Sequence, residues 1–189
     1  MSIAAMHPRP GDLRSVAEQI EQSTGLRVEI LGGTLVMSPT GRGKQAGTVL
    51  LIRRQLEPRL PTGLASYEVS SISMPGDVDD YCTPDLVVLP ESWSDDDWLI
   101  DPQDVDLAVE VISRSEKPQQ IIRKNGWYSA AGVRTLLVLD PRTGRWDLYN
   151  HPRNDDYHGH LDGSYDDPIP LPEPFGFDVD PSSPPRYKN

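Results

Sequence analysis

Short apolar runs alternate with segments of helical periodicity along most of this 189-residue chain. The helical spacing of apolar residues predicts helices over 12–23, 44–57 and 118–131. Strands are predicted over 26–31, 34–38, 66–74, 85–89, 106–112, 134–140 and 145–150. The resulting order, α-β-β-α-β-β-β-α-β-β, indicates a chain of the mixed α/β (α+β) class.

Glycine and proline mark the connections between these elements. Gly32-Gly33 predicts a two-residue hairpin turn, because glycine readily supplies the positive φ that such a turn needs. The segment PGDVDDY (75–81) is interpreted as a turn. With no internal repeat, we expect one domain over 1–189. Its core is placed at about 11–150, and an acidic, proline-rich C-terminal wrap with little regular structure is expected over 151–189.

The composition indicates the cellular compartment in which the protein is expected. A single cysteine, Cys82, excludes an intrachain disulfide and fits a reducing compartment. We find no apolar run of membrane-spanning length, and the first residues lack the basic and apolar regions of a signal peptide. A cytoplasmic protein that does not associate with a membrane is therefore expected.

The net charge of −11 argues against broad, nonspecific attraction to nucleic acid. The charge is uneven, however. Residues 150–189 hold eight acids and three bases, whereas basic side chains gather within 42–59 and again within 114–124. Both a local basic groove and an ordinary solvated surface fit this pattern.

Two carboxylates stand inside otherwise apolar, strand-like runs: Asp85 in TPDLVVLP and Glu110 in DLAVEVIS. An ionised acid in a buried strand costs several kcal/mol unless it is paired or coordinated. Neighbouring strands could aim both carboxylates at one cation. Two simpler readings stay open, a structural ion pair for Glu110 and exposure to water for Asp85, which follows Pro84.

The helix after the Glu110 strand supplies a third candidate. Gln120, Lys124 and Tyr128 are spaced i, i+4, i+8 and therefore share one helix face. A lysine there can neutralise charge or orient a water beside a metal held by Asp85 and Glu110. Mg²⁺ binds through one or two carboxylates, and a metal-associated water can attack a phosphodiester. A solvated lysine, or a direct ion pair with Glu110 that leaves no room for a cation, remains open.

The weaker candidates are Gln120 and Tyr128 on this helix face, together with Glu29 and Glu68. Glu29 and Glu68 lie in strand-like runs and could provide an outer carboxylate, but the same alternation also fits exposure to solvent. Cys82 has no histidine placed nearby, and we therefore interpret it as a small packing residue rather than a nucleophile.

The order Pro84-Asp85, Glu110, then a lysine resembles the PD-(D/E)XK nuclease superfamily. More narrowly, the chain resembles the Uma-type putative restriction endonuclease family. The matching segments cover most of residues 11–150 and are VEILGGTLVMSP (28–39), TPDLVVLP (83–90), DLAVEVISRS (106–115), and the run from Lys124 through Tyr128 and Ala131-Gly132-Val133 to LVLDP (137–141).

This resemblance implies a restriction-endonuclease-like fold, a mixed β-sheet core flanked by helices, with metal-dependent nuclease chemistry. It assigns Mg²⁺ or Mn²⁺ binding to Asp85 and Glu110. Because Ile112 stands two positions after Glu110, the resemblance assigns the lysine role to Lys124 on the helix. The substrate implied is DNA, and an enzyme that cuts both strands can act as a homodimer.

Several positions depart from the family pattern. The hairpin reads Gly32-Gly33 where Asp-Gly is common, and the histidine usual early in the next helix is replaced near Lys44. Gln120 stands in place of an acid, and Thr135-Leu136-Leu137 replaces an acid-and-aromatic segment. These departures support an alternative, a catalytically impaired member that acts as a binding or interaction module.

Overall fold

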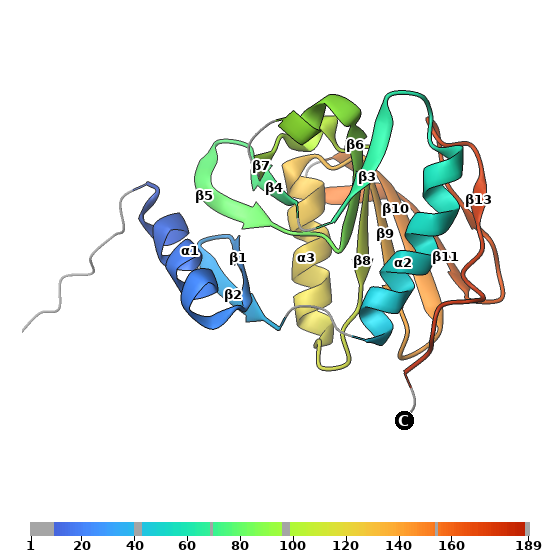
Figure 1. Cartoon of the computed structure of the whole chain (residues 1–189), viewed down its shortest axis with the longest axis horizontal. Coiled ribbons are helices and arrows are strands. Elements are labelled where there is room, and N and C mark those ends of the chain that lie inside the picture. Colours follow the sequence, from blue (N-terminus) through green and yellow to red (C-terminus); the bar gives the residue numbers. More distant parts are fainter. Residues whose placement is uncertain (1–9, 40–42, 69, 96–98, 154, 188–189) are drawn as a thin grey trace, which may run out of the picture.

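Three helices and two main β-sheets form the structure, a computed structural model that describes residues 10–39, 43–68, 70–95, 99–153 and 155–187 (Figure 1). The helices are α1 (Asp12–Thr24), α2 (Lys44–Leu56) and α3 (Pro118–Ala131). Each agrees with its predicted span to within one residue. In the described part of the chain, no helix combines the length and apolar character that crossing a membrane requires.

The larger sheet has the strand order β11-β10-β9-β8-β6-β3. Its strands are β3 (Leu64–Tyr67), β6 (Leu86–Pro90), β8 (Leu107–Val111), β9 (Thr135–Asp140), β10 (Arg145–Arg153) and β11 (Asp156–Ser164). Strands β8 and β9 are parallel, and the other neighbours are antiparallel. Parallel neighbours need a crossover connection, and α3 provides it.

The second sheet has the order β2-β1-β5-β4-β7. Its strands are β1 (Arg27–Leu31), β2 (Thr34–Ser38), β4 (Ser71–Met74), β5 (Asp77–Cys82) and β7 (Leu99–Ile100). Gly32 and Gly33 both have positive φ, which confirms the predicted hairpin turn between β1 and β2. Two short strands near the C-terminus, β12 (Ile169–Pro170) and β13 (Asp178–Val179), form a separate pair.

Apolar side chains cover both faces of the larger sheet. Leu107, Val109 and Val111 pack in the core cluster shared with α2, while Ala108 and Ile112 pack in the cluster shared with α3. This is the alternation expected along a strand. Glu110 has the parity of Ala108 and Ile112, so it projects from the sheet toward α3.

Two predicted elements in the middle of the chain are wrong. The single strand expected over 66–74 is two strands, β3 and β4, which belong to different sheets. The turn expected over 75–81 is limited to Pro75 and Gly76, because β5 begins at Asp77. The acids that made this segment look like a turn have structural partners. Asp79 accepts the Gly11 and Arg14 N–H groups at the start of α1, both at 2.9 Å.

The prediction of little regular structure after His151 is also wrong for the described residues. Strand β10 continues to Arg153, and β11 adds nine residues to the sheet. Figure 1 shows the C-terminal segment running beside α2. There it buries Ile169 and Val179 in the core cluster that includes α2. A sequence rich in aspartate, glycine and proline therefore still completes one face of the core.

Candidate active site

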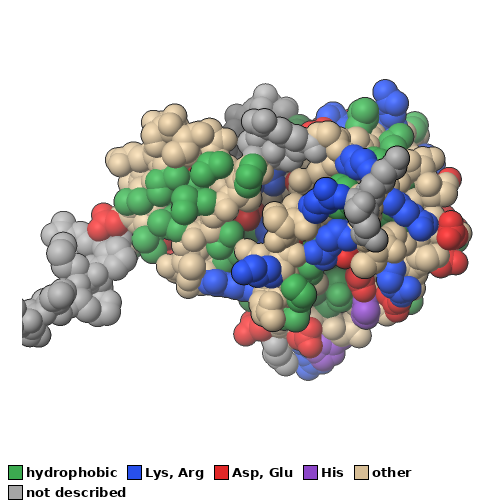
Figure 2. All heavy atoms as spheres, turned by 90° about the horizontal axis from the view of Figure 1, so that it is seen from below, with side chains coloured by type: hydrophobic (Ala, Val, Ile, Leu, Met, Phe, Trp, Pro, Cys, Tyr) green, Lys and Arg blue, Asp and Glu red, His purple; other side chains and the backbone are tan. Residues whose placement is uncertain are grey.

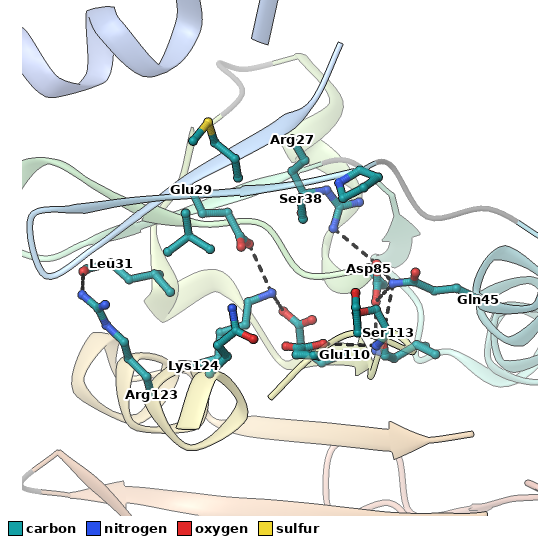
Figure 3. Close-up of a pocket in the computed structure, with 17 residues that line it drawn as sticks. Arg27, Glu29, Leu31, Ser38, Gln45, Asp85, Glu110, Ser113, Arg123 and Lys124 are labelled. Carbon is teal, nitrogen blue, oxygen red and sulfur yellow. Dashed lines mark hydrogen bonds and ion pairs between the residues drawn. The ribbon is translucent and has the colours of Figure 1, made fainter. Parts of the chain in front are cut away.

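The three residues expected to form a site line one pocket of about 450 Å³ (Figure 3). Asp85 precedes β6, Glu110 lies in β8, and Lys124 lies in α3. All three line the pocket although 39 positions separate the first from the last in the sequence. The structure thus brings the three side chains to one pocket.

Strand pairing explains why the carboxylates meet. Strands β6 and β8 are antiparallel neighbours, and the Asp85 N–H donates to the Val109 carbonyl at 3.0 Å. This puts Asp85 beside the β8 residues that flank Glu110. Because α3 follows β8 and packs on the face from which Glu110 projects, its Lys124 reaches the same pocket.

Asp85 is held by three donors. Its Oδ2 accepts the Val111 N–H at 2.8 Å, and its Oδ1 lies 3.3 Å from the Arg27 guanidinium. The Gln45 amide nitrogen lies 3.2 Å from each carboxylate oxygen and donates to the Val111 carbonyl at 3.1 Å. Asp85 is therefore buried among polar partners and is not exposed to water.

The sequence reasoning missed Arg27 and Gln45. Arg27 carried a usable signal, because it stands two residues before Glu29 in a strand and so shares its face. Gln45 carried none, since its approach depends on how α2 packs against the sheet.

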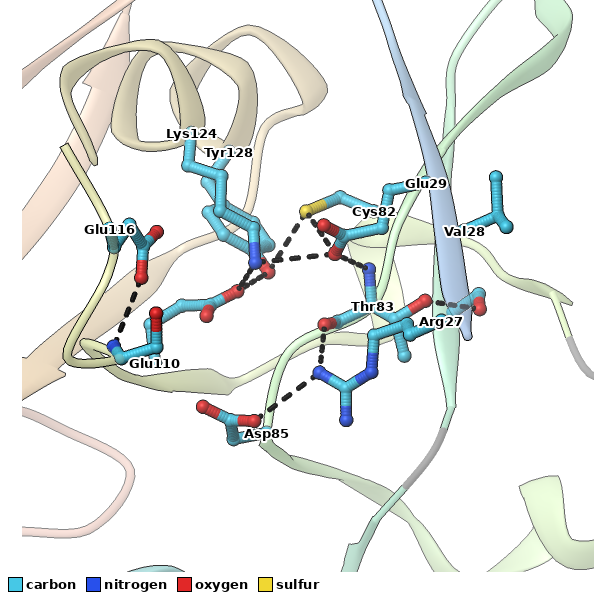
Figure 4. Close-up of polar contacts among 12 residues, drawn as sticks. Arg27, Val28, Glu29, Cys82, Thr83, Asp85, Glu110, Glu116, Lys124 and Tyr128 are labelled. Atoms are coloured by element: carbon cyan, nitrogen blue, oxygen red, sulfur yellow. Dashed lines mark hydrogen bonds and ion pairs between the residues drawn. The ribbon is translucent and has the colours of Figure 1, made fainter. Parts of the chain in front are cut away.

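Glu110 and Lys124 contact each other directly, with 2.7 Å between Oε1 and Nζ (Figure 4). Tyr128 donates its hydroxyl to the same Glu110 oxygen at 2.5 Å. Lys124 Nζ also lies 3.2 Å from Glu29 Oε1, so one ammonium serves two carboxylates. Glu29 additionally accepts the Thr83 N–H at 2.9 Å and the Cys82 thiol at 3.3 Å.

Burial and charge shift the proton affinities in this cluster. Burial raises the pKa of Glu110 to about 7; Lys124 opposes that rise, and the charges of Asp85 and Glu29 add to it. Burial alone would lower the pKa of Lys124, but the Cys82, Glu110 and Glu29 side chains raise it well above its ordinary value. Lys124 therefore stays protonated near neutral pH and cannot serve as a general base.

The weaker candidates have different outcomes. Glu29 is buried and faces the pocket, so the alternative of solvent exposure is wrong for it. Tyr128 contacts Glu110, and Gln120 lines the pocket while its side-chain oxygen accepts the Lys117 N–H at the start of α3. Glu68 is on the surface, where it pairs with Arg53 away from the pocket.

Among the described residues, one group of side chains brings several possible metal ligands close together, and a second set of oxygen atoms lines the same pocket. Glu29, Cys82 and Glu110 place ligand atoms within 4.8 Å of one another. Lys124 already contacts both carboxylates of that group, and burial raises the pKa of the Cys82 thiol, which keeps it protonated. The Asp85 carboxylate, the Val111 carbonyl and the pocket-lining Glu110 carboxylate offer only oxygen. This set fits Mg²⁺ or Mn²⁺ better, because hard cations prefer oxygen ligands.

Basic side chains surround this end of the molecule. Figure 2 shows Lys and Arg side chains gathered on the face seen from below, although the chain carries a net charge of −11. Arg27, Arg123 and Lys124 line the pocket itself, facing the acids at its base. The pocket lining thus holds three bases against four acids, so its charges are nearly balanced.

A comparison with protein families matches residues 16–181 to the Uma2 family, described as "Putative restriction endonuclease". The chain belongs to this family. The Uma2 assignment confirms the resemblance inferred from the DLAVEVISRS and TPDLVVLP segments, and with it a nuclease-like chain of the restriction endonuclease type. No protein with a curated description matches the chain.

Among solved structures, one that is similar is a protein of Anabaena variabilis ATCC 29413 described as "a putative nuclease belonging to DUF820". The two chains are 16% identical, with a TM-score of 0.64 over 84% of this chain and 89% of the other. At that identity the likeness concerns the fold. It confirms the predicted fold class, a mixed α+β architecture with sheets flanked by helices.

Proposed function

We propose that this Uma2 protein is a Mg²⁺-dependent endonuclease that hydrolyses phosphodiester bonds of DNA, with Mn²⁺ as an alternative cation. The observation that carries the proposal is the convergence of Asp85, Glu110 and Lys124 on one pocket, within a chain of the restriction endonuclease type. We further propose that the enzyme acts in the cytoplasm, and as a homodimer when both strands are cut.

Each residue has a distinct role in this proposal. Asp85 and Glu110 would hold the cation, which supplies a metal-associated water as nucleophile and offsets charge on the phosphoryl oxygen. Lys124 stays protonated, so it positions Glu110 through the 2.7 Å contact and can stabilise the negative charge that develops during hydrolysis. Arg27 balances the charge of Asp85 and lines the route by which a phosphate would approach.

Replacing Glu110 by Gln tests this function. The variant keeps the side-chain shape but removes the charge, and we expect loss of Mg²⁺- or Mn²⁺-dependent cleavage of plasmid DNA by at least about a hundredfold. Glu68→Gln is the matched control, because Glu68 lies outside the pocket, and it should cleave like the wild type. Full cleavage by a folded Glu110→Gln protein would rule out the assigned role.

The direct Glu110–Lys124 contact also supports a second candidate, a binding or interaction module of the same fold. An ammonium 2.7 Å from a carboxylate is the geometry of a structural ion pair. This candidate predicts no metal-dependent cleavage by the wild type, together with partner binding that survives Glu110→Gln. The cleavage assay above therefore separates the two functions.

A further inference from the structure

The Gln45 side chain lies among the oxygen atoms best suited to a hard cation. Its Nε2 is 3.2 Å from both Asp85 carboxylate oxygens and 3.1 Å from the Val111 carbonyl oxygen. Figure 3 shows Gln45 reaching Asp85 from α2, on the far side of the pocket from Glu29. One neutral NH2 group, with two hydrogens to donate, thus lies within hydrogen-bond distance of three acceptor oxygens.

A cation and this amide group cannot share the position. Mg²⁺ binds oxygen at about 2.0–2.1 Å and Ca²⁺ at about 2.3–2.6 Å, both much shorter than the 3.1–3.2 Å contacts of the amide nitrogen. An ion drawn to Asp85 and the Val111 carbonyl would sit against Gln45 Nε2, and its charge would repel the N–H groups. The Gln45 Nε2 group must therefore move away before the ion binds these oxygens.

We propose that Gln45 is a displaceable plug of the cation site. In the metal-free protein, the Gln45 amide donates hydrogen bonds to the Asp85 carboxylate and the Val111 carbonyl. Cation binding displaces this amide. This inference rests on the proposed function, because it concerns the same cation. In this proposal Gln45 sets the affinity of the site for the cation. It takes no part in the hydrolysis that we assign to Asp85, Glu110 and Lys124.

Gln45 can move more easily than Lys124 and Arg27, the charged residues that contact the carboxylates of Glu110 and Asp85. It carries no charge, is only half-buried, and lies in the first turn of α2. Lys124, by contrast, is bound to Glu29 and Glu110 together, and its loss would leave two buried acids uncompensated. Arg27 is charged and also donates to the Thr83 carbonyl, which holds it against the segment between β5 and β6.

Calorimetric titration of the full chain with Mn²⁺ tests the plug. Gln45→Ala removes the donor, and Gln45→Met removes it while keeping a long side chain. Hydrogen bonds to a charged group are strong, so losing this competitor should lower the Kd for Mn²⁺ by about tenfold in both variants. Gln119→Ala, an exposed residue of α3 outside the pocket lining, is the control and should bind like the wild type.

The outcomes separate this inference from the proposed function. If the wild type binds Mn²⁺ and folded Gln45→Ala and Gln45→Met bind it equally or more weakly, the plug is wrong and the metal-dependent function stands. If neither the wild type nor any variant takes up Mn²⁺, the cation site itself is wrong and the plug falls with it. Tighter binding by both variants, with Gln119→Ala unchanged, is the expected result.

Discussion

Lys124 sets the charge balance of the candidate site, because its one ammonium contacts Glu29 and Glu110. These two acids come from different strands and would repel each other without it. Tyr128 adds a hydroxyl donor to Glu110 at 2.5 Å. The helix spacing i, i+4 therefore delivers two donors to one carboxylate oxygen.

The raised pKa of Glu110 predicts how pH changes the stability of the metal-free protein. Between its ordinary value of 4.5 and about 7, Glu110 holds a proton in the folded state that it has lost in the unfolded state. Its contribution to the free energy of unfolding is therefore full below pH 4.5 and is lost as the pH rises to 7, by at most about 3 kcal/mol. Urea unfolding in a chelator, from pH 5 to 8, measures this change.

Glu110→Gln cannot titrate and is the reference for that measurement. The stability of the wild type relative to this variant should fall as the pH rises, and Glu68→Gln should track the wild type throughout. A difference between wild type and Glu110→Gln that stays constant or grows with pH would contradict the assignment of the titration to Glu110.

At the scale of elements, α3 connects the parallel strands and carries the site's lysine, yet it contains Gly126. A Cβ at Gly126 would meet no atom within 4 Å outside its own helix and chain neighbours, and the residue has no positive φ. Alanine favours a helix over glycine by about 1 kcal/mol. We therefore expect Gly126→Ala to raise the Tm by about 2–4 °C in a thermal unfolding experiment.

Gly132, which caps the same helix, provides the opposite case. Its φ of +90° is poorly tolerated by residues with a Cβ, so Gly132→Ala should lower the Tm although space for the methyl group exists. A fall in Tm with Gly126→Ala, similar to that with Gly132→Ala, would mean that flexibility within α3 is needed for its packing.

The elements differ in how well their sequence predicts them. The three helices and the hairpin at Gly32-Gly33 were correct, because periodicity and turn residues act locally. Strand β5 was missed because Asp80 looks like a turn residue but is buried in a strand. Its carboxylate accepts the Trp127 indole N–H at 2.9 Å and the Gly32 N–H at 2.7 Å, and both partners are distant in sequence.

The candidate site was predictable to a similar extent. Asp85 and Glu110 were visible because acids in apolar strands need an explanation, and helix spacing added Lys124. Arg27 could have been found, because it shares a strand face with Glu29. Gln45 could not be assigned to the pocket, because its approach depends on how α2 packs against strands far away in the sequence. Local patterns thus located the carboxylates, and tertiary packing decided their partners.

Across the whole molecule, only some of the basic side chains line the pocket at which we propose that DNA binds. Arg27, Arg123 and Lys124 line the pocket of a chain with net charge −11. Each phosphate neutralised by a basic residue contributes about −0.9 to the slope of log K against log salt. We expect Glu110→Gln protein to bind duplex DNA with a slope between about −2 and −4 in fluorescence anisotropy from 50 to 200 mM salt.

Two variants check the origin of that salt dependence. Arg123→Gln should make the slope shallower by about one. Arg134→Gln removes a base that pairs with Asp106 outside the pocket lining, and it should leave the slope unchanged. If adding Arg123→Gln to the Glu110→Gln protein leaves the slope of log K against log salt unchanged, Arg123 does not bind phosphate.

The contact of Lys124 with Glu29 and Glu110 has a consequence for evolution. Glu29 belongs to the second sheet and Glu110 to the larger sheet, so the ammonium to which we assign a role in cleavage also joins the two sheets. Even a family member without the proposed DNA cleavage would be under selection to keep these residues, since losing the ammonium would leave two buried acids without a partner. Finding Glu29, Glu110 and Lys124 in a related protein would therefore indicate a stable fold as much as DNA cleavage.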